Sequence, residues 1–333
     1  MDARYTALTQ WISRTLGHVD DMRPASADAS FRRYFRIVTD RRSVIAMDAP
    51  PEHETVFDYV RIARRLAAIG LNVPEILDGD EDNGFLLLSD LGETLYLQCL
   101  KPSSPPGVEA ERLYGDALAA LVTLQTGGLA DPGFLPAYSA ELLRREMELF
   151  PEWYLGRHLG RPPDIHERRL LDQAFDVLVA SALEQPQVWV HRDYHSRNLM
   201  RTARNNPGIL DFQDAVLGPV TYDLVSLLKD AYIAWPKVQV DEWAMGFCRL
   251  EIDSGLIQKR DEDHFLRWFD LMGVQRHLKV AGIFARLNYR DSKARYLADI
   301  PRVLSYIEDV LPFYPELQGL SEIMARYRVP ATA

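Results

Sequence analysis

The stretch HRDYHSRNLM, from His191 to Met200, decides the fold assignment of this chain. Two histidines, two arginines, an aspartate and an asparagine stand within ten residues, directly after the apolar segment QVWV. A short apolar run of this kind is typical of a buried strand. Because a core strand does not normally run into so many polar side chains, we expect this stretch to bind a ligand.

Four of these residues, His191, Arg192, Asp193 and Asn198, fit the pattern H-R-D-x-x-x-x-N. This pattern resembles the catalytic loop of protein-kinase-like phosphotransferases. A second motif, ILDFQD, places Asp211 thirteen residues after Asn198, at the end of an apolar segment and before a phenylalanine. That context resembles the metal-binding D-F-G element of the same enzymes. The two motifs together predict phosphoryl transfer.

The chemistry of phosphoryl transfer explains why these residue types recur at this spacing. Transfer needs charge neutralisation and alignment more than covalent help. Asp193 is predicted to accept the proton of the attacking hydroxyl. Asn198 and Asp211 are predicted to hold Mg²⁺ against the phosphates of ATP, because hard oxygen ligands suit this ion. The alternatives are a helix cap for Asp193 and a loop hydrogen bond for Asn198.

Other residues near the loop narrow the class of kinase. His195 completes H-x-D-x-H-x-x-N, which resembles aminoglycoside phosphotransferases and choline kinases and places His195 near the substrate. His191 is expected to orient the loop. Asp223, in GPVTYDLVSLL, is expected to hydrogen-bond the loop backbone, or to be a helix N-terminal charge. Only eleven residues separate Asp211 from Asp223, too few for a peptide-binding activation loop. A small-molecule substrate is therefore favoured.

The expected nucleotide site departs from the usual kinase pattern. The place of the glycine-rich loop reads ASADASFRRYF, where Ser30 and its small neighbours could bring backbone amides to phosphate. The strand that should carry a lysine reads VIAMD, so that no cation stands there. Arg32 and Arg33 are the candidate replacements, although such a pair is often simply solvated. Leu88 and Ser89, in LLLSDLG, are expected to meet the adenine.

The order of elements predicts a bilobal, protein-kinase-like α+β fold. Residues 1–95 are expected to form a small β-rich nucleotide-binding lobe, and residues 96–333 a larger, mainly helical lobe. Helices are predicted at the segments Ala110–Thr126, Ser139–Trp153, Ile165–Leu183, Tyr222–Ile233, Val240–Ser254, Glu262–Leu287 and Ile300–Leu311.

Composition limits the other possibilities. The chain has 333 residues, of which 47% are hydrophobic, and a net charge of −10, which disfavours nucleic-acid binding. The two cysteines, Cys99 and Cys248, form no metal or disulfide pattern and suit a reducing compartment. No apolar run reaches the ~18 residues of a membrane span. We therefore expect a cytoplasmic protein without a membrane partner.

A basic stripe lies near the C-terminus of this acidic chain. Residues 271–295 contain six lysines and arginines and one acidic residue. On a helix, Arg276 and Lys279 fall on one side together with Arg286 and Arg290. A solvated charged face is the ordinary reading. The absence of mixed charge favours anion binding instead, and Arg276, His277 and Lys279 are the candidate substrate contacts.

A closer resemblance rests on QRHLKVAGIFARLNYRDSKARYLADIPRVLSYI, DASFRRYFRI and AMDAPPE. These segments resemble bacterial anomeric kinases of N-acetylmuramate and N-acetylglucosamine, in which the strand lysine is also absent. The resemblance implies transfer from ATP to the sugar, giving an α-1-phosphate for a nucleotidyltransferase in peptidoglycan recycling. Two alternatives stay open: a kinase of an aminoglycoside or amino alcohol, and a pseudokinase that only binds nucleotide.

Overall fold

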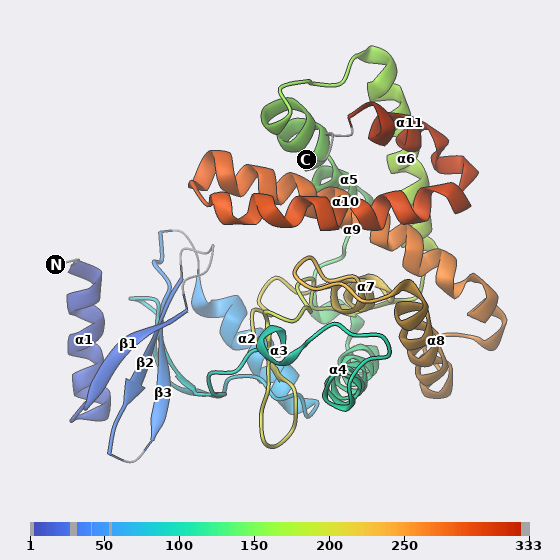
Figure 1. The fold of residues 1–333 in the computed structure, drawn as a ribbon. Coiled ribbons are helices and arrows are strands. Elements are labelled where there is room, and N and C mark those ends of the chain that lie inside the picture. The colour runs from blue at the N-terminus through green and yellow to red at the C-terminus, as the bar shows by residue number, and fades with distance from the viewer. Residues whose placement is uncertain (1–2, 27–31, 41, 53–54, 328–333) are drawn as a thin grey trace. The chain divides into compact units, whose positions relative to one another are not determined.

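A computed structural model describes residues 3–26, 32–40, 42–52 and 55–327 of the chain. The chain forms two compact units. The first comprises Met1–Tyr96 and Asn198–Asp214, and the second comprises Leu97–Arg197 and Ala215–Ala333. Figure 1 shows the chain coloured from blue at the N-terminus to red at the C-terminus.

The first unit is built on a five-stranded antiparallel sheet with the order β1-β2-β3-β5-β4. Its strands are β1 (Asp21–Ser26), β2 (Arg33–Val38), β3 (Ser43–Asp48), β4 (Ile76–Asp80) and β5 (Phe85–Ser89). Short apolar segments on either side of the polar turns Thr39–Ser43 and Asp80–Gly84 predict two pairs of strands, and the structure confirms them as β2 with β3 and β4 with β5. The sequence did not predict β1, which contains Pro24. Because proline cannot donate to a ladder, the position of β1 at the sheet edge suits it.

Helix α1 (Ala3–Leu16) closes one face of this sheet with an apolar side (Figure 1). Leu8, Trp11 and Ile12 are buried against the sheet residues Phe35, Ile37, Val44, Ala46, Phe85 and Leu87. Helix α2 (Val56–Ala68) has an apolar face of its own, and the residues of this face are buried. The unit also contains the short antiparallel pair β7 (Leu199–Met200) and β8 (Gly208–Ile209). Backbone hydrogen bonds from Arg201 to Thr94 (2.8 Å) and from Ile209 to Asn72 (2.8 Å) attach this pair to the first 96 residues.

The second unit is mainly helical. Its helices are α4 (Val108–Gly127), α5 (Ala140–Met147), α6 (Ile165–Glu184), α7 (Tyr222–Leu228), α8 (Lys237–Ser254), α9 (Glu262–Asp291), α10 (Ile300–Val310) and α11 (Gln318–Arg326). Short helix α3 (Tyr96–Cys99) and a π-helix (Phe150–His158) complete the principal helical segments. Strands β6 (Gln187–Val190) and β9 (Val216–Pro219) pair antiparallel. Figure 1 shows α10 lying alongside α9.

Helix α9 is the core element of the second unit. Almost every residue from Phe265 to Leu287 is buried, including polar ones, because α5, α6, α7, α8 and α10 all pack against it. Most predicted helical segments are confirmed with slightly shifted ends. The helix that begins at Tyr222 ends at Leu228 and not at Ile233, the segment Ser139–Trp153 divides into α5 and the start of the π-helix, and α11 was not predicted. No helix in the described part of the chain is long and apolar enough to cross a membrane.

Candidate active site

The catalytic loop follows β6 and is held by a buried carboxylate of α7. Asp223 accepts hydrogen bonds from the backbone N–H groups of His191 (2.6 Å) and Arg192 (2.9 Å). Burial raises the pKa of Asp223 to about 6, against the lowering effect of His191 and these hydrogen bonds. The Asp193 N–H donates to His191 Nδ1 at 3.2 Å. This hydrogen bond joins His191 to the next residue but one of the loop, and its role in orienting the loop stays a prediction.

The turn has a strained backbone at its centre. Arg192 adopts a φ of +77°, in the left-handed region that side chains other than glycine rarely occupy. Such strain persists only where the surroundings hold it, and it clusters at functional sites. Here the two hydrogen bonds to Asp223 flank the strained residue. They fix the direction in which the next residue, Asp193, leaves the turn.

A second buried carboxylate, Asp230, holds the far side of the loop. It accepts hydrogen bonds from the backbone N–H groups of Ser196 (2.9 Å) and Tyr232 (2.8 Å). The ring of Tyr232 meets the His195 ring edge-on, with 5.4 Å between centroids. His195 thus has a fixed position beside Asp193. The sequence reasoning did not single out Asp230, and its one signal was an aspartate directly after a strongly apolar helix.

Glu146, on α5, forms an ion-pair centre that the sequence reasoning also missed. Its buried carboxylate pairs with Arg192, accepts a hydrogen bond from Tyr138, and lies 3.1 Å from Lys279 Nζ. Burial alone would raise the pKa of Glu146, but the charges of Lys279 and Arg192 outweigh it and lower the pKa. The available signal was an acidic residue on the apolar face of the helix, beside Leu143 and Met147.

These charges set the ionisation of Asp193. Burial tends to raise its pKa, yet the positive charges of Lys279 and Arg276, with His195, lower it overall. Asp193 is therefore a carboxylate at neutral pH and can accept a proton. The cluster around Glu146 contributes to this, because it holds both Lys279 and Arg192 in place. A carboxylate whose charge is maintained by its neighbours is what the predicted role of general base requires.

The predicted metal ligands come together in the first unit. The side chains of Asn198 and Asp211 approach to 3.5 Å, between the amide nitrogen and a carboxylate oxygen as assigned. The amide can be turned so that its oxygen faces the same point. Asp211 has a φ of +63° and an exposed side chain, and Gln213 donates to it at 2.8 Å. The exposed carboxylate of Asp211 and the amide oxygen of the buried Asn198 are the hard oxygen ligands that suit Mg²⁺.

The two candidate arginines of the phosphate loop behave differently. Arg33 on β2 pairs with Asp48 on β3, and Arg4 pairs with the same carboxylate. Arg32 instead places Nη1 3.9 Å from Asp211 Oδ1, beside the predicted metal ligands. Of the two residues at the usual lysine position, Met47 is buried and Asp48 is engaged by the arginines. Ser30 lies outside the described residues.

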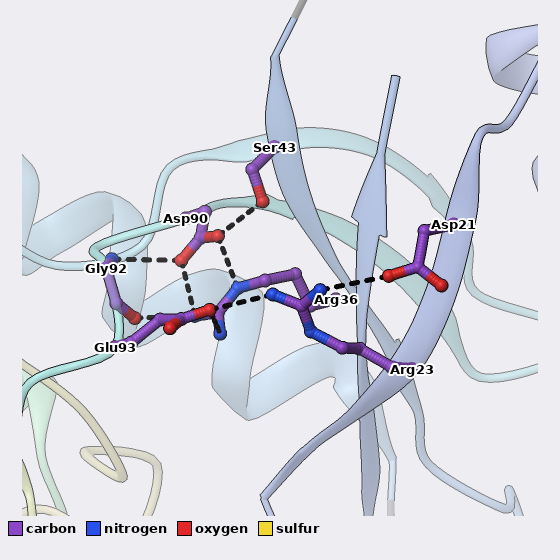
Figure 2. A network of polar contacts seen from close by, with 7 residues as sticks. All are labelled: Asp21, Arg23, Arg36, Ser43, Asp90, Gly92 and Glu93. Carbon is purple, nitrogen blue, oxygen red and sulfur yellow. Dashed lines mark hydrogen bonds and ion pairs between the residues drawn. The ribbon is translucent and has the colours of Figure 1, made fainter. Parts of the chain in front are cut away.

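The segment after β5 is fixed by a polar network, drawn in Figure 2. Asp90 accepts two hydrogen bonds from Arg36 (2.7 and 3.0 Å) and one from Ser43 (2.6 Å), while Arg36 also bonds Glu93 (2.6 Å). Burial tends to raise the pKa of Asp90, but these partners lower it. The network holds the chain directly after Leu88, which is buried, and Ser89, whose Oγ accepts from the Glu75 N–H at 2.8 Å.

The three candidate substrate residues of α9 lie in different surroundings. Lys279 Nζ donates to Tyr222 Oη at 2.9 Å and pairs with Glu146. His277 donates from Nε2 to the Lys229 carbonyl at 2.9 Å and stacks on Tyr306. Arg276 is buried as well, but its Nε and Nη1 have no hydrogen-bond acceptor within the described structure.

Residues 21–269 match the phosphotransferase enzyme family, and the chain belongs to that family. Three curated relatives share the name N-acetylmuramate/N-acetylglucosamine kinase. The one from Pseudomonas aeruginosa is 47% identical, over 97% of this chain and 97% of its own. Those from Pseudomonas putida and Neisseria meningitidis are 43% and 44% identical, over 100% and 96% of this chain and 99% and 95% of their own. The resemblance inferred from the sequence is confirmed.

Solved structures place the fold in the same group. An ADP-bound aminoglycoside phosphotransferase matches with a TM-score of 0.58 and 13% identity, over 92% of this chain and 98% of its own. A choline kinase from Streptococcus pneumoniae matches with a TM-score of 0.58 and 11% identity, over 92% and 100%. At this identity they establish the fold alone. The predicted protein-kinase-like class is confirmed.

Proposed function

We propose that this chain is an ATP-dependent kinase that phosphorylates the anomeric hydroxyl of N-acetylmuramate and N-acetylglucosamine. The products are the sugar α-1-phosphate and ADP. The observation that carries the proposal is the 43–47% identity, along nearly the whole of both chains, to relatives that bear this kinase name. The proposal extends to a cytoplasmic role in peptidoglycan recycling, with a nucleotidyltransferase consuming the sugar phosphate.

In the proposed reaction, the carboxylate of Asp193 accepts the proton of the anomeric hydroxyl as its oxygen attacks the γ-phosphorus. The new O–P bond forms while the bond from the γ-phosphorus to the β,γ-bridging oxygen breaks, and the electron pair leaves with ADP. The lowered pKa of Asp193 supports this role, because a base must be unprotonated before the attack. Asp223 and Asp230 act as positioning residues for the loop.

Asn198 and Asp211 are the proposed Mg²⁺ ligands, and the ion would neutralise charge on the ATP phosphates. Arg32 is the better candidate than Arg33 for the cation that replaces the strand lysine. Arg32 lies beside Asp211, whereas Arg33 is engaged by Asp48. Leu88 and Ser89 stay our candidates for adenine contact, and Ser30 for phosphate contact.

The test is ADP release from magnesium-ATP with N-acetylmuramate, N-acetylglucosamine, free glucosamine, kanamycin and choline, followed by phosphorus NMR of the product. We expect an anomeric phosphate on the two N-acetylated sugars and no turnover of the cations. Turnover of kanamycin or choline in their place would discard the sugar assignment while keeping the catalytic loop. ATP binding without turnover of any compound would indicate a pseudokinase.

A further inference from the structure

Helix α9 presents three basic side chains to the interior, and two of them, Lys279 and His277, already have a hydrogen-bond partner within the chain. Lys279 is held by Glu146 and Tyr222, so its charge is neutralised within the protein. His277 is hydrogen-bonded to the Lys229 carbonyl, and burial together with the charge of Arg276 lowers its pKa to about 3. A neutral ring in this position serves the packing of α9. Neither residue is available to bind an anion.

Arg276 differs from both of its neighbours. It is only 3% exposed, and its Nε and Nη1 are buried without a hydrogen-bond acceptor. Among the residues that the structure describes, no carboxylate pairs with it. A guanidinium keeps its positive charge inside a protein, and an unpaired buried charge is strongly unfavourable. The side chain is therefore built to receive an acceptor from outside the chain.

His195 places this arginine at the catalytic loop. His195 is 9% exposed, and its Nδ1 is likewise buried without a partner. Burial lowers the pKa of His195, and the positive charge of Arg276 contributes in the same direction. Arg276 also helps to lower the pKa of Asp193. Arg276 and His195, each with a buried nitrogen that has no partner, thus lie close enough to Asp193 to influence its pKa.

We propose that Arg276, assisted by His195, binds a carboxylate of the substrate and so selects a sugar acid over the corresponding neutral sugar. The inference rests on the proposed function. Of the two sugars in the relatives' name, N-acetylmuramate carries a lactyl carboxylate and N-acetylglucosamine carries no charge. A guanidinium forms two parallel hydrogen bonds with a carboxylate, which gives geometric selectivity as well as attraction. The neutral sugar would leave Arg276 unpaired.

The test compares the two sugars in Arg276→Gln, Arg276→Lys and the control Arg290→Gln. Arg290 is exposed, pairs with Asp291, and lies about 21 Å from Arg276 along α9. We expect Arg276→Gln to lower the ratio of kcat/KM for N-acetylmuramate over that for N-acetylglucosamine by about 10- to 100-fold, the value of a charged hydrogen bond. Arg276→Lys should recover part of the ratio, and Arg290→Gln should leave it unchanged.

Two outcomes would overturn the inference. An equal loss with both sugars would assign Arg276 to the transferring phosphate or to the ionisation of Asp193. An unchanged ratio would remove it from recognition altogether. Calorimetric titration of each sugar into the wild type and Arg276→Gln provides a second readout that does not depend on turnover. If the wild type binds both sugars but transfers no phosphate, the proposed function fails while the inference is still decided by this binding ratio.

The thermal stability of the unliganded protein separates recognition from a structural role. Removing an unpaired buried charge should leave the melting temperature of Arg276→Gln equal to or above that of the wild type. A structural arginine would instead lower the melting temperature when it is replaced. A clear drop for Arg276→Gln, with none for Arg290→Gln, would therefore contradict the inference.

Discussion

At the scale of single residues, Asp193 is partly buried and yet keeps its negative charge, because neighbouring positive charges lower its pKa. We expect Asp193→Asn to lower kcat by at least about 10²- to 10⁴-fold, the usual contribution of a general base, because the amide cannot accept the proton. The fold should be retained, since asparagine has the same shape. Steady-state ADP release measures the rate. Asp253→Asn, an exposed position in the same unit, is the control. A rate within tenfold of the wild type would remove Asp193 from the role of base.

His277 makes a pH-dependent contribution to stability. Its pKa is about 3 in the folded protein, against about 6.5 in the unfolded chain. Below about pH 6.5 the unfolded chain therefore binds the extra proton, so that stability is lost as the pH falls. The loss amounts to about 2 kcal/mol between about pH 7.5 and about pH 5. His277→Gln should remove this part of the pH dependence, which urea unfolding at the two pH values measures.

The wild type must be compared with His277→Gln because two carboxyl groups change the stability with pH in the opposite direction. Burial raises the pKa of Asp223 to about 6 and that of Glu251 to about 7. The folded state therefore holds those protons at pH values where the unfolded chain has released them, and stability falls as the pH rises. Only the difference between the wild type and His277→Gln gives the contribution of His277 to the pH dependence of stability. An identical pH dependence in both proteins would mean that the pKa of His277 is the same in the folded and unfolded states, and would contradict the prediction.

The motif H-R-D-x-x-x-x-N was enough to predict the class of enzyme from the sequence. The basic stripe was less informative, because it did not show which of its cations are neutralised within the protein. Spacing placed Arg276 and Lys279 on one helical side, but α9 is buried on nearly all sides, so that the side faces protein and not solvent. Which cation is neutralised depends on Glu146, which belongs to a distant part of the chain. Periodicity within one helix contains no information about such a partner. That two nitrogens of Arg276 lack a hydrogen-bond partner could therefore be learned only from the structure.

At the scale of elements, α5 stabilises the catalytic loop through one carboxylate. We expect Glu146→Gln to reduce the free energy of unfolding by about 3 kcal/mol, because it leaves Arg192 and Lys279 without their counter-charge in a buried position. Glu148→Gln, at the end of the same helix, removes a partly exposed pair with Arg168 and should cost at most about 1 kcal/mol. Urea unfolding followed by circular dichroism measures both. Equal losses of unfolding free energy would mean that Glu146 stabilises the protein no more than a partly exposed ion pair does.

Sequence patterns predicted the long helices and the apolar strands β2 to β6. Helices such as α6 and α9 extend over several turns, so that their apolar periodicity is evident. The missed strands β1, β7 and β9 have few residues or contain proline, and their pairing is set by tertiary contacts. The π-helix after α5 was read as a continuation of that helix. Its wider turn changes the hydrogen-bond partners and not the apolar content, so composition could not distinguish it.

At the scale of the whole molecule, the order of strands and helices was enough to predict the fold class. The sequence did not predict that residues 198–214 belong to the first unit. Their place there depends on hydrogen bonds to distant residues, such as those from Arg201 to Thr94 and from Ile209 to Asn72. The consequence for function is that Asn198, Asp211 and Arg32 belong to one unit. The proposed nucleotide and metal contacts can therefore be tested together, independently of the sugar.

That test is the thermal unfolding of the protein with ADP, with and without Mg²⁺. A ligand at about 100 times its dissociation constant stabilises the folded state by about 3 kcal/mol. We expect Mg²⁺ to add to the stabilisation by ADP in the wild type, and chelation to reverse the addition. Asp211→Asn should abolish the magnesium-dependent part, since it removes the proposed carboxylate ligand while asparagine tolerates the left-handed backbone there. Asp82→Asn, which removes an exposed charge from the same unit, should keep that part. If Asp211→Asn retained the full magnesium increment, the ion would be held by ADP alone, and the assignment of Asp211 as its ligand would be wrong.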